Sequence, residues 1–262
     1  SAMILWRTIS KELQEVRELL KLVKIEFYKL RRKKLIWLML LSAFVMPFFA
    51  FLYFGYLGQT DIAPAIFYKW SAFGFTLFII LPFILGLFGT MLMHDENRYD
   101  MLKQLWIVPV SKMGYFFSKF FVVLIYSICF MLINAFASVL FSVIPNYVSF
   151  DWGSIMFLLE RCIEIAVLAA FAVLPILAVS ASQKGYLFPV GVTLVYVFAG
   201  FLITPVNSFL HPLSCILVII ARNWAISDLA LPQAQIPLAL ASICIWSILS
   251  VLLANIKLGE RK

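Results

Sequence analysis

The sequence is poor in charge. Of its 262 residues, 13% are Asp, Glu, Lys or Arg, whereas 64% are hydrophobic and 16% are aromatic, and the mean hydropathy is +1.01. Soluble domains are about half apolar and about a quarter charged, so a soluble core could not bury this much apolar surface. We therefore expect a polytopic membrane protein.

The residues that usually build catalytic and metal sites are also scarce. The chain has two histidines, His94 and His211, and they fall on opposite sides of the predicted membrane. It lacks the nucleotide-binding pattern G-x-x-x-x-G-K-[ST], a nucleophile-elbow serine and any C-x-x-C pair. We predict no catalytic residue, no metal site and no cofactor in this chain. We interpret the four cysteines as buried small apolar side chains: Cys129, Cys162, Cys215 and Cys244.

Long apolar runs are what the sequence has instead. A bilayer admits helical bundles or closed barrels, and runs of about 20 residues favour helices. In the fifth run, Gly191 and Gly200 are expected to permit close helix packing. We predict an all-α fold with six transmembrane helices, at about residues 35–57, 70–93, 114–144, 152–180, 186–204 and 237–256.

Two segments differ from the long apolar runs of the six-span domain (residues 35–256). One precedes the domain and the other lies within it. Residues 1–34 are basic, with apolar residues at helical spacing, which predicts an amphipathic elbow on the cytoplasmic membrane surface. The basic end of this segment is also typical of an ordinary positive-inside topology signal, and a segment can be both an elbow and such a signal. Residues 205–235 contain three prolines and an apolar run too short to cross, which predicts an extracellular re-entrant helical pair. The apolar residues of the elbow are Leu13, Val16, Leu19, Leu20, Val23 and Phe27.

The charge distribution predicts the orientation. Eighteen of the 21 Lys and Arg residues lie in the elbow, the polar segment 94–119, the turn at Lys184 and the tail 257–262. The positive-inside rule places these segments, and therefore both termini, in the cytoplasm. We expect the chain to span the plasma membrane several times. The net charge of +8 is explained by this orientation and by lipid headgroups, and we expect no nucleic-acid partner.

The polar segment between the second and third spans is the most distinctive part of the chain. Acidic residues are followed by Met101, Leu105 and Val108 on one helical face and by Leu102 and Trp106 on an adjoining one. These predict a short amphipathic helix that presents its charged side to a partner and ends at Pro109. A plain solvated loop is the alternative.

This segment resembles the loop of ABC-2 type permease subunits, in particular those of lantibiotic-immunity and bacitracin-export type. The layout of elbow, six spans and re-entrant pair resembles that family too. Trp106 departs from the pattern, in which this position is more often aliphatic. The matching residues are Glu96, Leu102, Lys103, Leu105, Pro109, Val110, Ser111, Lys112 and Lys119.

The resemblance implies a permease half that pairs with a second permease subunit, identical or related, above two separate ATPase subunits. ATP and Mg would then be bound by the ATPases, and this chain would not be an enzyme. Segment 94–113 would couple the two proteins, with the elbow as a brace. The coupling residues implied are Asp95, Glu96, Arg98, Leu102, Leu105, Trp106 and Pro109.

A second group of charges lies within the predicted fourth span: Glu160, Arg161 and Glu164. Each ionisable group near the bilayer centre costs ~2.5–3.5 kcal/mol on insertion scales. Arg161 and Glu164 can pair at i, i+3. Two interpretations stay open, a self-neutralising ion pair and an acidic lining on the exit path of a cationic peptide.

We therefore expect an ABC-2 permease that exports an amphipathic or hydrophobic substrate, with a peptide antibiotic or toxin as first choice, for self-immunity or resistance. The alternative is an ion- or proton-coupled secondary transporter that uses Glu160 and Glu164. A membrane-integral enzyme is disfavoured because the sequence carries no catalytic set.

Overall fold

The computed structural model describes residues 6, 19–58, 61–98, 112–183, 185–221 and 235–260, apart from the side chains of residues 95–98 and 260. Every regular element within these residues is a helix, which confirms the predicted all-α membrane fold. α10 (Leu187–Ile203), the fifth predicted span, has 17 residues, at the short end for a spanning helix. Five helical runs are long and apolar enough to cross a membrane: Lys34–Tyr56, Pro64–His94, Lys112–Val143, Trp152–Ser182 and Ile236–Gly259.

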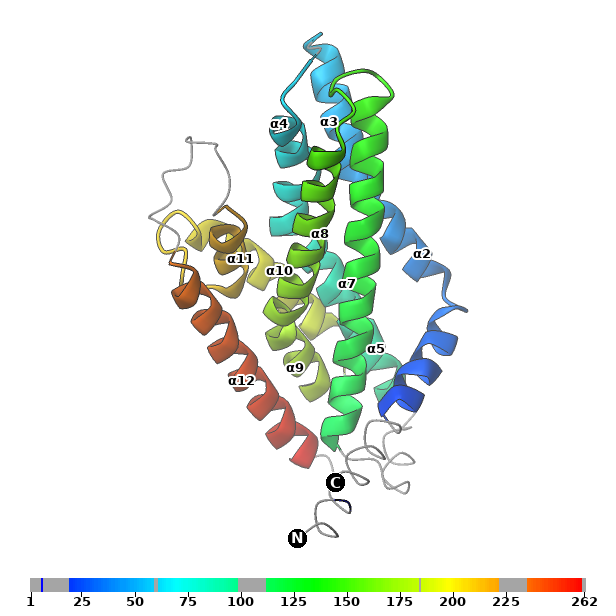
Figure 1. The fold of residues 1–262 in the computed structure, drawn as a ribbon. Coiled ribbons are helices and arrows are strands. Elements are labelled where there is room, and N and C mark those ends of the chain that lie inside the picture. The colour runs from blue at the N-terminus through cyan, green and yellow to red at the C-terminus, as the bar shows by residue number, and fades with distance from the viewer. Residues whose placement is uncertain are drawn as a thin grey trace.

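The long helices lie side by side around one core (Figure 1). α7 (Lys112–Val143) and α8 (Trp152–Ala172) pack along each other, and α9 (Leu174–Ser182) continues the path of α8. α5 (Leu81–Arg98) packs on α7 and α9, and α12 (Ile236–Glu260) closes the bundle against α9. The second, third and fourth predicted spans therefore form the centre of the bundle.

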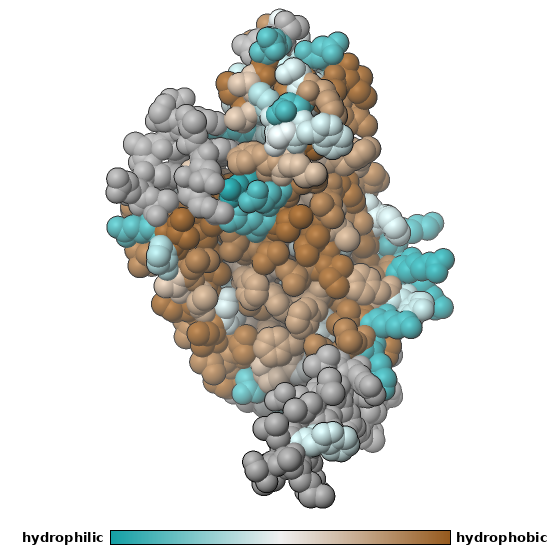
Figure 2. Space-filling model, in the orientation of Figure 1, coloured by the Kyte–Doolittle hydropathy of each residue, from teal (hydrophilic) through white to brown (hydrophobic). Residues whose placement is uncertain are grey.

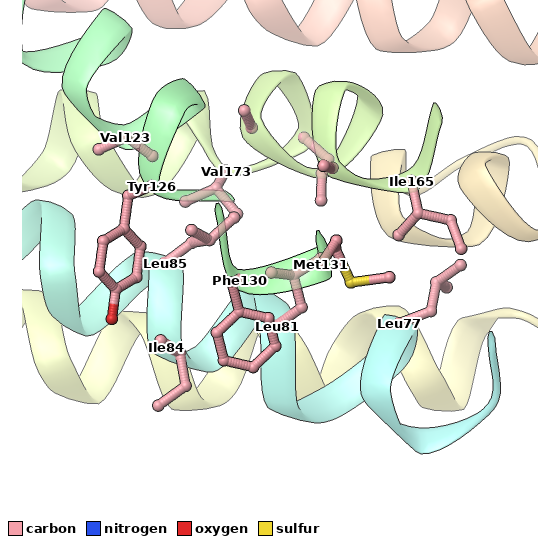
Figure 3. Close-up of a cluster of buried hydrophobic side chains, with 14 of the residues drawn as sticks. Leu77, Leu81, Ile84, Leu85, Val123, Tyr126, Phe130, Met131, Ile165 and Val173 are labelled. Atoms are coloured by element: carbon pink, nitrogen blue, oxygen red, sulfur yellow. The ribbon is translucent and has the colours of Figure 1, made fainter. Parts of the chain in front are cut away.

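Apolar side chains fill this core and also cover the outside. Figure 3 shows Leu81 of α5 beside Phe130 and Met131 of α7, and Ile165 of α8 beside Leu77. The outer surface is also largely hydrophobic (Figure 2), as expected of a protein whose solvent is lipid. Helix association in such a solvent depends on close packing and on buried hydrogen bonds rather than on the hydrophobic effect.

Proline explains where most of these helices begin. Its missing N–H is harmless in a first turn, where no intrahelical partner exists, but breaks a helix interior. Pro175, for example, is the second residue of α9, so the predicted fourth span consists of two helices that meet at Val173. The prolines that lie in first turns are Pro47, Pro64, Pro82, Pro175, Pro189, Pro212 and Pro237.

The first and second spans are interrupted by irregular turns. The first consists of α2 (Lys34–Leu41), η1 (Ser42–Phe44) and α3 (Val45–Tyr56). The second begins at α4 (Pro64–Tyr68), six residues before the predicted start at Trp70, because Pro64 opens a helical turn in the expected loop. It continues through η2 (Lys69–Phe73) and η3 (Thr76–Ile80), two wide turns separated at Gly74.

A single buried side chain of α7 donates hydrogen bonds to the irregular backbone of both spans. The Asn134 Nδ2 donates to the carbonyl oxygen of Ala43 at 2.8 Å and to that of Ser71 at 3.4 Å. The Ser71 carbonyl also accepts from the Thr76 hydroxyl at 3.2 Å. Irregular backbone at membrane depth is tolerated where protein groups satisfy it, and Asn134 does so for two spans at once.

The C-terminal part of the bundle contains a helix too short to span. α11 (Pro212–Ala221) has ten residues, nearly all buried against α8, α10 and α12. A Cβ at Gly200 of α10 would lie 2.9 Å from the His211 ring, so the predicted close packing at Gly200 is confirmed. The prediction of close packing is wrong at Gly191, where no described atom lies within 4 Å of the position that a Cβ would occupy. Residues 222–234 lie outside the described residues, and the re-entrant pair stays a prediction.

All four cysteines are free thiols. Cys162 and Cys215 are buried as predicted, but Cys129 and Cys244 are exposed on the sides of α7 and α12. The prediction of burial was wrong for these two because an apolar neighbourhood in sequence does not distinguish a core face from a lipid face.

Candidate functional site

The segment predicted to couple to an ATPase is flanked by α5 and α7. α5 extends to Arg98, so Asp95, Glu96 and Arg98 continue the second span instead of starting a separate short helix. Their side chains are not among those described. The other predicted coupling residues lie outside the described residues: Leu102, Leu105, Trp106 and Pro109.

The elbow helix (residues 19–30) lies against the bundle on this side (Figure 1). The residues that are not exposed are Leu19, Leu22, Val23, Glu26 and Leu30, which recur at helical spacing. Leu20 and Phe27, which belong to the predicted apolar face, are exposed rather than buried against the bundle; their placement on the membrane surface stays a prediction. The bundle is instead contacted by a face that includes a carboxylate.

That carboxylate forms a buried ion pair with the third span. Glu26 Oε2 lies 2.7 Å from the Nζ of Lys119 in α7, and the two side chains are 8% and 1% exposed. The other oxygen, Oε1, accepts a hydrogen bond from Lys29 Nζ at 2.9 Å. A buried charge is very costly without a partner, so this pair fixes the elbow helix to α7 at one position.

Positive charge is in excess around the pair. Lys33 follows the elbow helix, and burial lowers the pKa of its ammonium group; the charges of Lys119 and Lys29 lower the pKa further, while Glu26 raises it. Like charges and burial both disfavour the charged form of a lysine. Glu26 is therefore the acidic residue on which several cations of this region converge.

The pair is connected to both flanks of the predicted coupling segment. Lys119 Nζ lies 5.3 Å from the ring centroid of Tyr115, a cation–π distance. The Tyr115 hydroxyl contacts Met93 Sδ at 3.6 Å, near the end of α5. Contacts therefore run from the elbow helix through α7 to α5.

Two further contacts gather other segments at this end of the molecule. Lys112 Nζ, at the start of α7, lies 3.5 Å from the carbonyl oxygen of Gly259 in α12. The rings of His94 and Tyr186 lie 5.5 Å apart, which joins α5 to the residue preceding α10. The contacts at this end therefore connect α5 and α7 to the elbow helix, to α12 and to the residue preceding α10.

Sequence reasoning missed Glu26. Lys119 was singled out through the family motif, whereas Glu26 was one acid within a basic helix. A signal was present: Glu26 shares the spacing of Leu22, Val23 and Leu30, and a charged residue on an apolar helix face requires a partner.

The second predicted group of charges lies on α8. Arg161 is 3% exposed, and its Nη1 forms the expected ion pair with Glu164 Oε2. Its guanidinium also lies 5.4 Å from the Phe157 ring centroid. Arg161 thus lies inside the bundle, anchored on its own helix.

Glu160 differs from its two neighbours. Its Oε1 is 3.9 Å from Arg161 Nη2, yet its side chain is 70% exposed. Trp152, Met156 and Ile163 are exposed on the same helix, and Figure 2 shows a hydrophilic patch within the apolar face on which α8 lies. The part of the chain that the structure describes holds no group of three or more residues that could ligate a metal.

The comparison with protein families gives a match over most of the chain. The family model described as "ABC-2 family transporter protein" matches residues 22–200, from the elbow helix into α10. That range includes both members of the Glu26–Lys119 pair and the three charges of α8. None of the curated proteins compared with the chain matches it.

Proposed function

This chain belongs to the ABC-2 family of transporter proteins, and from that premise we propose that it exports an amphipathic or hydrophobic substrate, first of all a peptide antibiotic or toxin. As a member of the family it is a membrane permease of an ABC transporter, and in such systems the ATPase activity resides on a separate subunit. Membership favours ATP-driven transport over the secondary transporter considered as the alternative.

The observation that carries the proposal is the set of contacts around Lys119. A permease without its own nucleotide site must receive force from another chain, and the force must enter on a surface connected to the spans. The elbow helix, α5 and α7 meet at Glu26, Met93, Tyr115 and Lys119. A rigid base of this kind supports a docking role for the segment between α5 and α7.

In the proposed complex, residues 95–109 occupy a groove on an ATPase subunit that binds ATP and Mg. Closure of two ATPases pushes on two copies of this segment, one from each of two permease subunits, identical or related. Trp106 and Leu105 would supply apolar contacts, and Glu96 a charged contact. The elbow helix resists rotation of α7 during the push.

Glu160 motivates the proposal of a cationic amphipathic substrate. A carboxylate exposed on a spanning helix is costly against lipid, and an aqueous path or a subunit interface removes that cost. With Glu164 paired to Arg161, Glu160 is the member of the group placed to attract a cation. Its exposed apolar neighbours suit the other side of an amphipathic peptide.

The test is co-expression with a candidate ABC ATPase subunit, co-purification, and reconstitution in vesicles. We expect permease-dependent stimulation of ATP hydrolysis that falls at least about tenfold in Leu105→Ala and Glu96→Ala. Controls are Leu202→Ala and Asp61→Asn, which change an exposed leucine and an exposed carboxylate away from this segment; asparagine tolerates the positive φ of 60° at position 61. Transport by the chain alone in a proton gradient, with no ATPase bound, would refute the proposal.

The same vesicles test the substrate class. Glu160→Gln is expected to reduce export of a cationic peptide while leaving the complex assembled, because the Glu160 side chain is 70% exposed and Arg161 keeps its closer ion pair with Glu164. Arg161→Gln is expected to reduce assembly itself. Export that is unchanged in Glu160→Gln would exclude this carboxylate from the path.

A further inference from the structure

A basic pocket lies where the chain turns from the elbow helix into the first span. It encloses about 550 Å³ and is lined by Ile25, Tyr28, Lys29, Arg31 and Arg32. The described part of its wall thus combines three cationic groups with one aliphatic and one aromatic side chain. This composition matches an amphiphile that carries negative charge.

Among the side chains that the structure describes, the cations at this pocket outnumber the acids. Glu26 is shared between Lys29 and Lys119. Arg31 and Arg32 are exposed, and within the described residues no salt bridge joins either of them to a carboxylate. Burial lowers the pKa of the ammonium group of Lys33, the next residue along the chain, and the charge of Lys119 lowers that pKa further. An external anion would relieve this mutual repulsion.

The location selects a membrane anion rather than a dissolved one. α2 begins at Lys34, directly after the turn, and is the first apolar run able to cross. Leu20, Phe27 and Tyr28 of the elbow helix remain exposed, as in a helix that rests on the bilayer surface. Figure 2 shows hydrophilic side chains gathered at this edge of the molecule, beside the apolar band. The pocket therefore lies at headgroup depth.

We propose that this pocket binds the headgroup of one anionic phospholipid from the leaflet on which the elbow helix lies. The Arg31 and Arg32 guanidinium groups pair with the phosphate oxygens, a geometry that suits the planar fork of arginine. Ile25 and the Tyr28 ring contact the first part of the acyl chains. A zwitterionic lipid would carry its own ammonium group into the cationic pocket, so the site discriminates against it.

The site does not depend on the transport function, and it suggests a structural use for the lipid. A bound phosphate would neutralise the turn next to the Glu26–Lys119 pair, which keeps the elbow helix seated on α7. We therefore expect the anionic lipid to stabilise the folded protein more than a zwitterionic lipid does.

The test is native mass spectrometry of the full chain released from nanodiscs of mixed phosphatidylglycerol and phosphatidylcholine. We expect one phosphatidylglycerol retained per chain, with retention reduced roughly tenfold or more in Arg31→Gln/Arg32→Gln. The matched control is Lys24→Gln/Lys34→Gln, which removes the same charge from exposed residues of the same segment that do not line the pocket. The control is expected to retain the lipid, and its thermal unfolding, like that of the test variant, is measured in lipid-free detergent.

Three outcomes would overturn the site. Equal loss in the control variant would mean that only overall charge attracts the lipid. Equal retention of phosphatidylcholine would mean that the headgroup is not recognised. Displacement of phosphatidylglycerol by millimolar inorganic phosphate, with the same dependence on Arg31 and Arg32, would make the pocket a site for a free anion. Loss of retention in the arginine variant alone supports the proposal whether or not an ATPase partner is found.

Discussion

Lys119 is the most consequential single residue in the described part of the chain. It is 1% exposed, and its charge is balanced by Glu26 from the elbow helix. Removing one member of a buried ion pair costs about 3–5 kcal/mol, because the other charge stays buried without a partner. We predict that Lys119→Gln and Glu26→Gln each lower the midpoint of thermal unfolding of the detergent-solubilised protein, and that Lys119→Met/Glu26→Leu recovers much of the loss.

Lys29→Gln is the control for this prediction. Lys29 bonds the same carboxylate, but its side chain is 44% exposed, so water replaces most of what is lost. If Lys119→Gln were no more destabilising than Lys29→Gln, the pair would not hold the elbow helix. A second outcome is that both single variants are destabilised, whereas the apolar double variant is stable but transports poorly. The ion pair would then be needed for coupling to the ATPase rather than for the stability of the fold.

Two ion pairs of the described residues, Arg161–Glu164 and Glu26–Lys119, differ in how far the sequence could predict them. Arg161 and Glu164 are three residues apart on one helix, so helical periodicity alone predicts their contact, which the structure contains. Glu26 and Lys119 come from distant segments. Their contact depends on how the elbow helix is rotated against α7, and apolar residues on two sides of that helix left the rotation undetermined.

At the scale of elements, Gly86 of α5 allows α10 to pack closely against α5. A Cβ at Gly86 would lie 2.3 Å from Thr193 Cγ2, and the Thr193 hydroxyl already donates to the Pro189 carbonyl oxygen at 2.8 Å. Overpacking a tight core contact typically costs about 1–3 kcal/mol. We predict that Gly86→Ala destabilises the protein by about this amount, measured as a reduced free energy of unfolding in mixed micelles.

Gly191→Ala supplies the matched control for Gly86→Ala. Gly191 lies on α10, and no described atom lies within 4 Å of the point that its Cβ would occupy. Alanine favours a helix over glycine by about 1 kcal/mol. Gly191→Ala is therefore expected to be neutral or slightly stabilising. Equal effects of the two substitutions would contradict the close approach of α5 and α10.

Helices of this chain were predictable where apolar runs are long, and less so where the backbone is irregular. The third span, expected over residues 114–144, is α7 within two residues at its start and one at its end. The wide turns around Gly74 were not predictable, because they depend on Asn134 and Thr76 satisfying the freed Ser71 carbonyl. Gly86 was likewise not distinguished from Gly191, since glycine spacing does not reveal which face a neighbouring helix occupies.

For the molecule as a whole, the cation-rich segments lie toward one end of the bundle. The elbow helix, the start of α7 and the end of α12 are joined there by the contacts of Lys119 and Lys112. The loop after α7 lies at the other end, where Ile62 N donates to the Tyr147 carbonyl oxygen at 2.7 Å. This segregation agrees with the positive-inside rule, but the rule, not the fold, supplies the direction.

Cysteine labelling tests that direction on intact cells. In a background with Cys129, Cys162, Cys215 and Cys244 replaced by alanine, Ser149→Cys and Gly185→Cys place one thiol at an exposed position near each end. We predict that a membrane-impermeant maleimide labels Ser149→Cys on whole cells, and labels Gly185→Cys only after the membrane is opened. The reverse pattern would put the Glu26–Lys119 base outside the cell, where no ATPase could dock, and would remove the physical basis for the coupling role of residues 95–109. Labelling of both positions on intact cells would mean that the fourth span, Trp152–Ser182, does not cross the membrane, because that span is what separates the two sites.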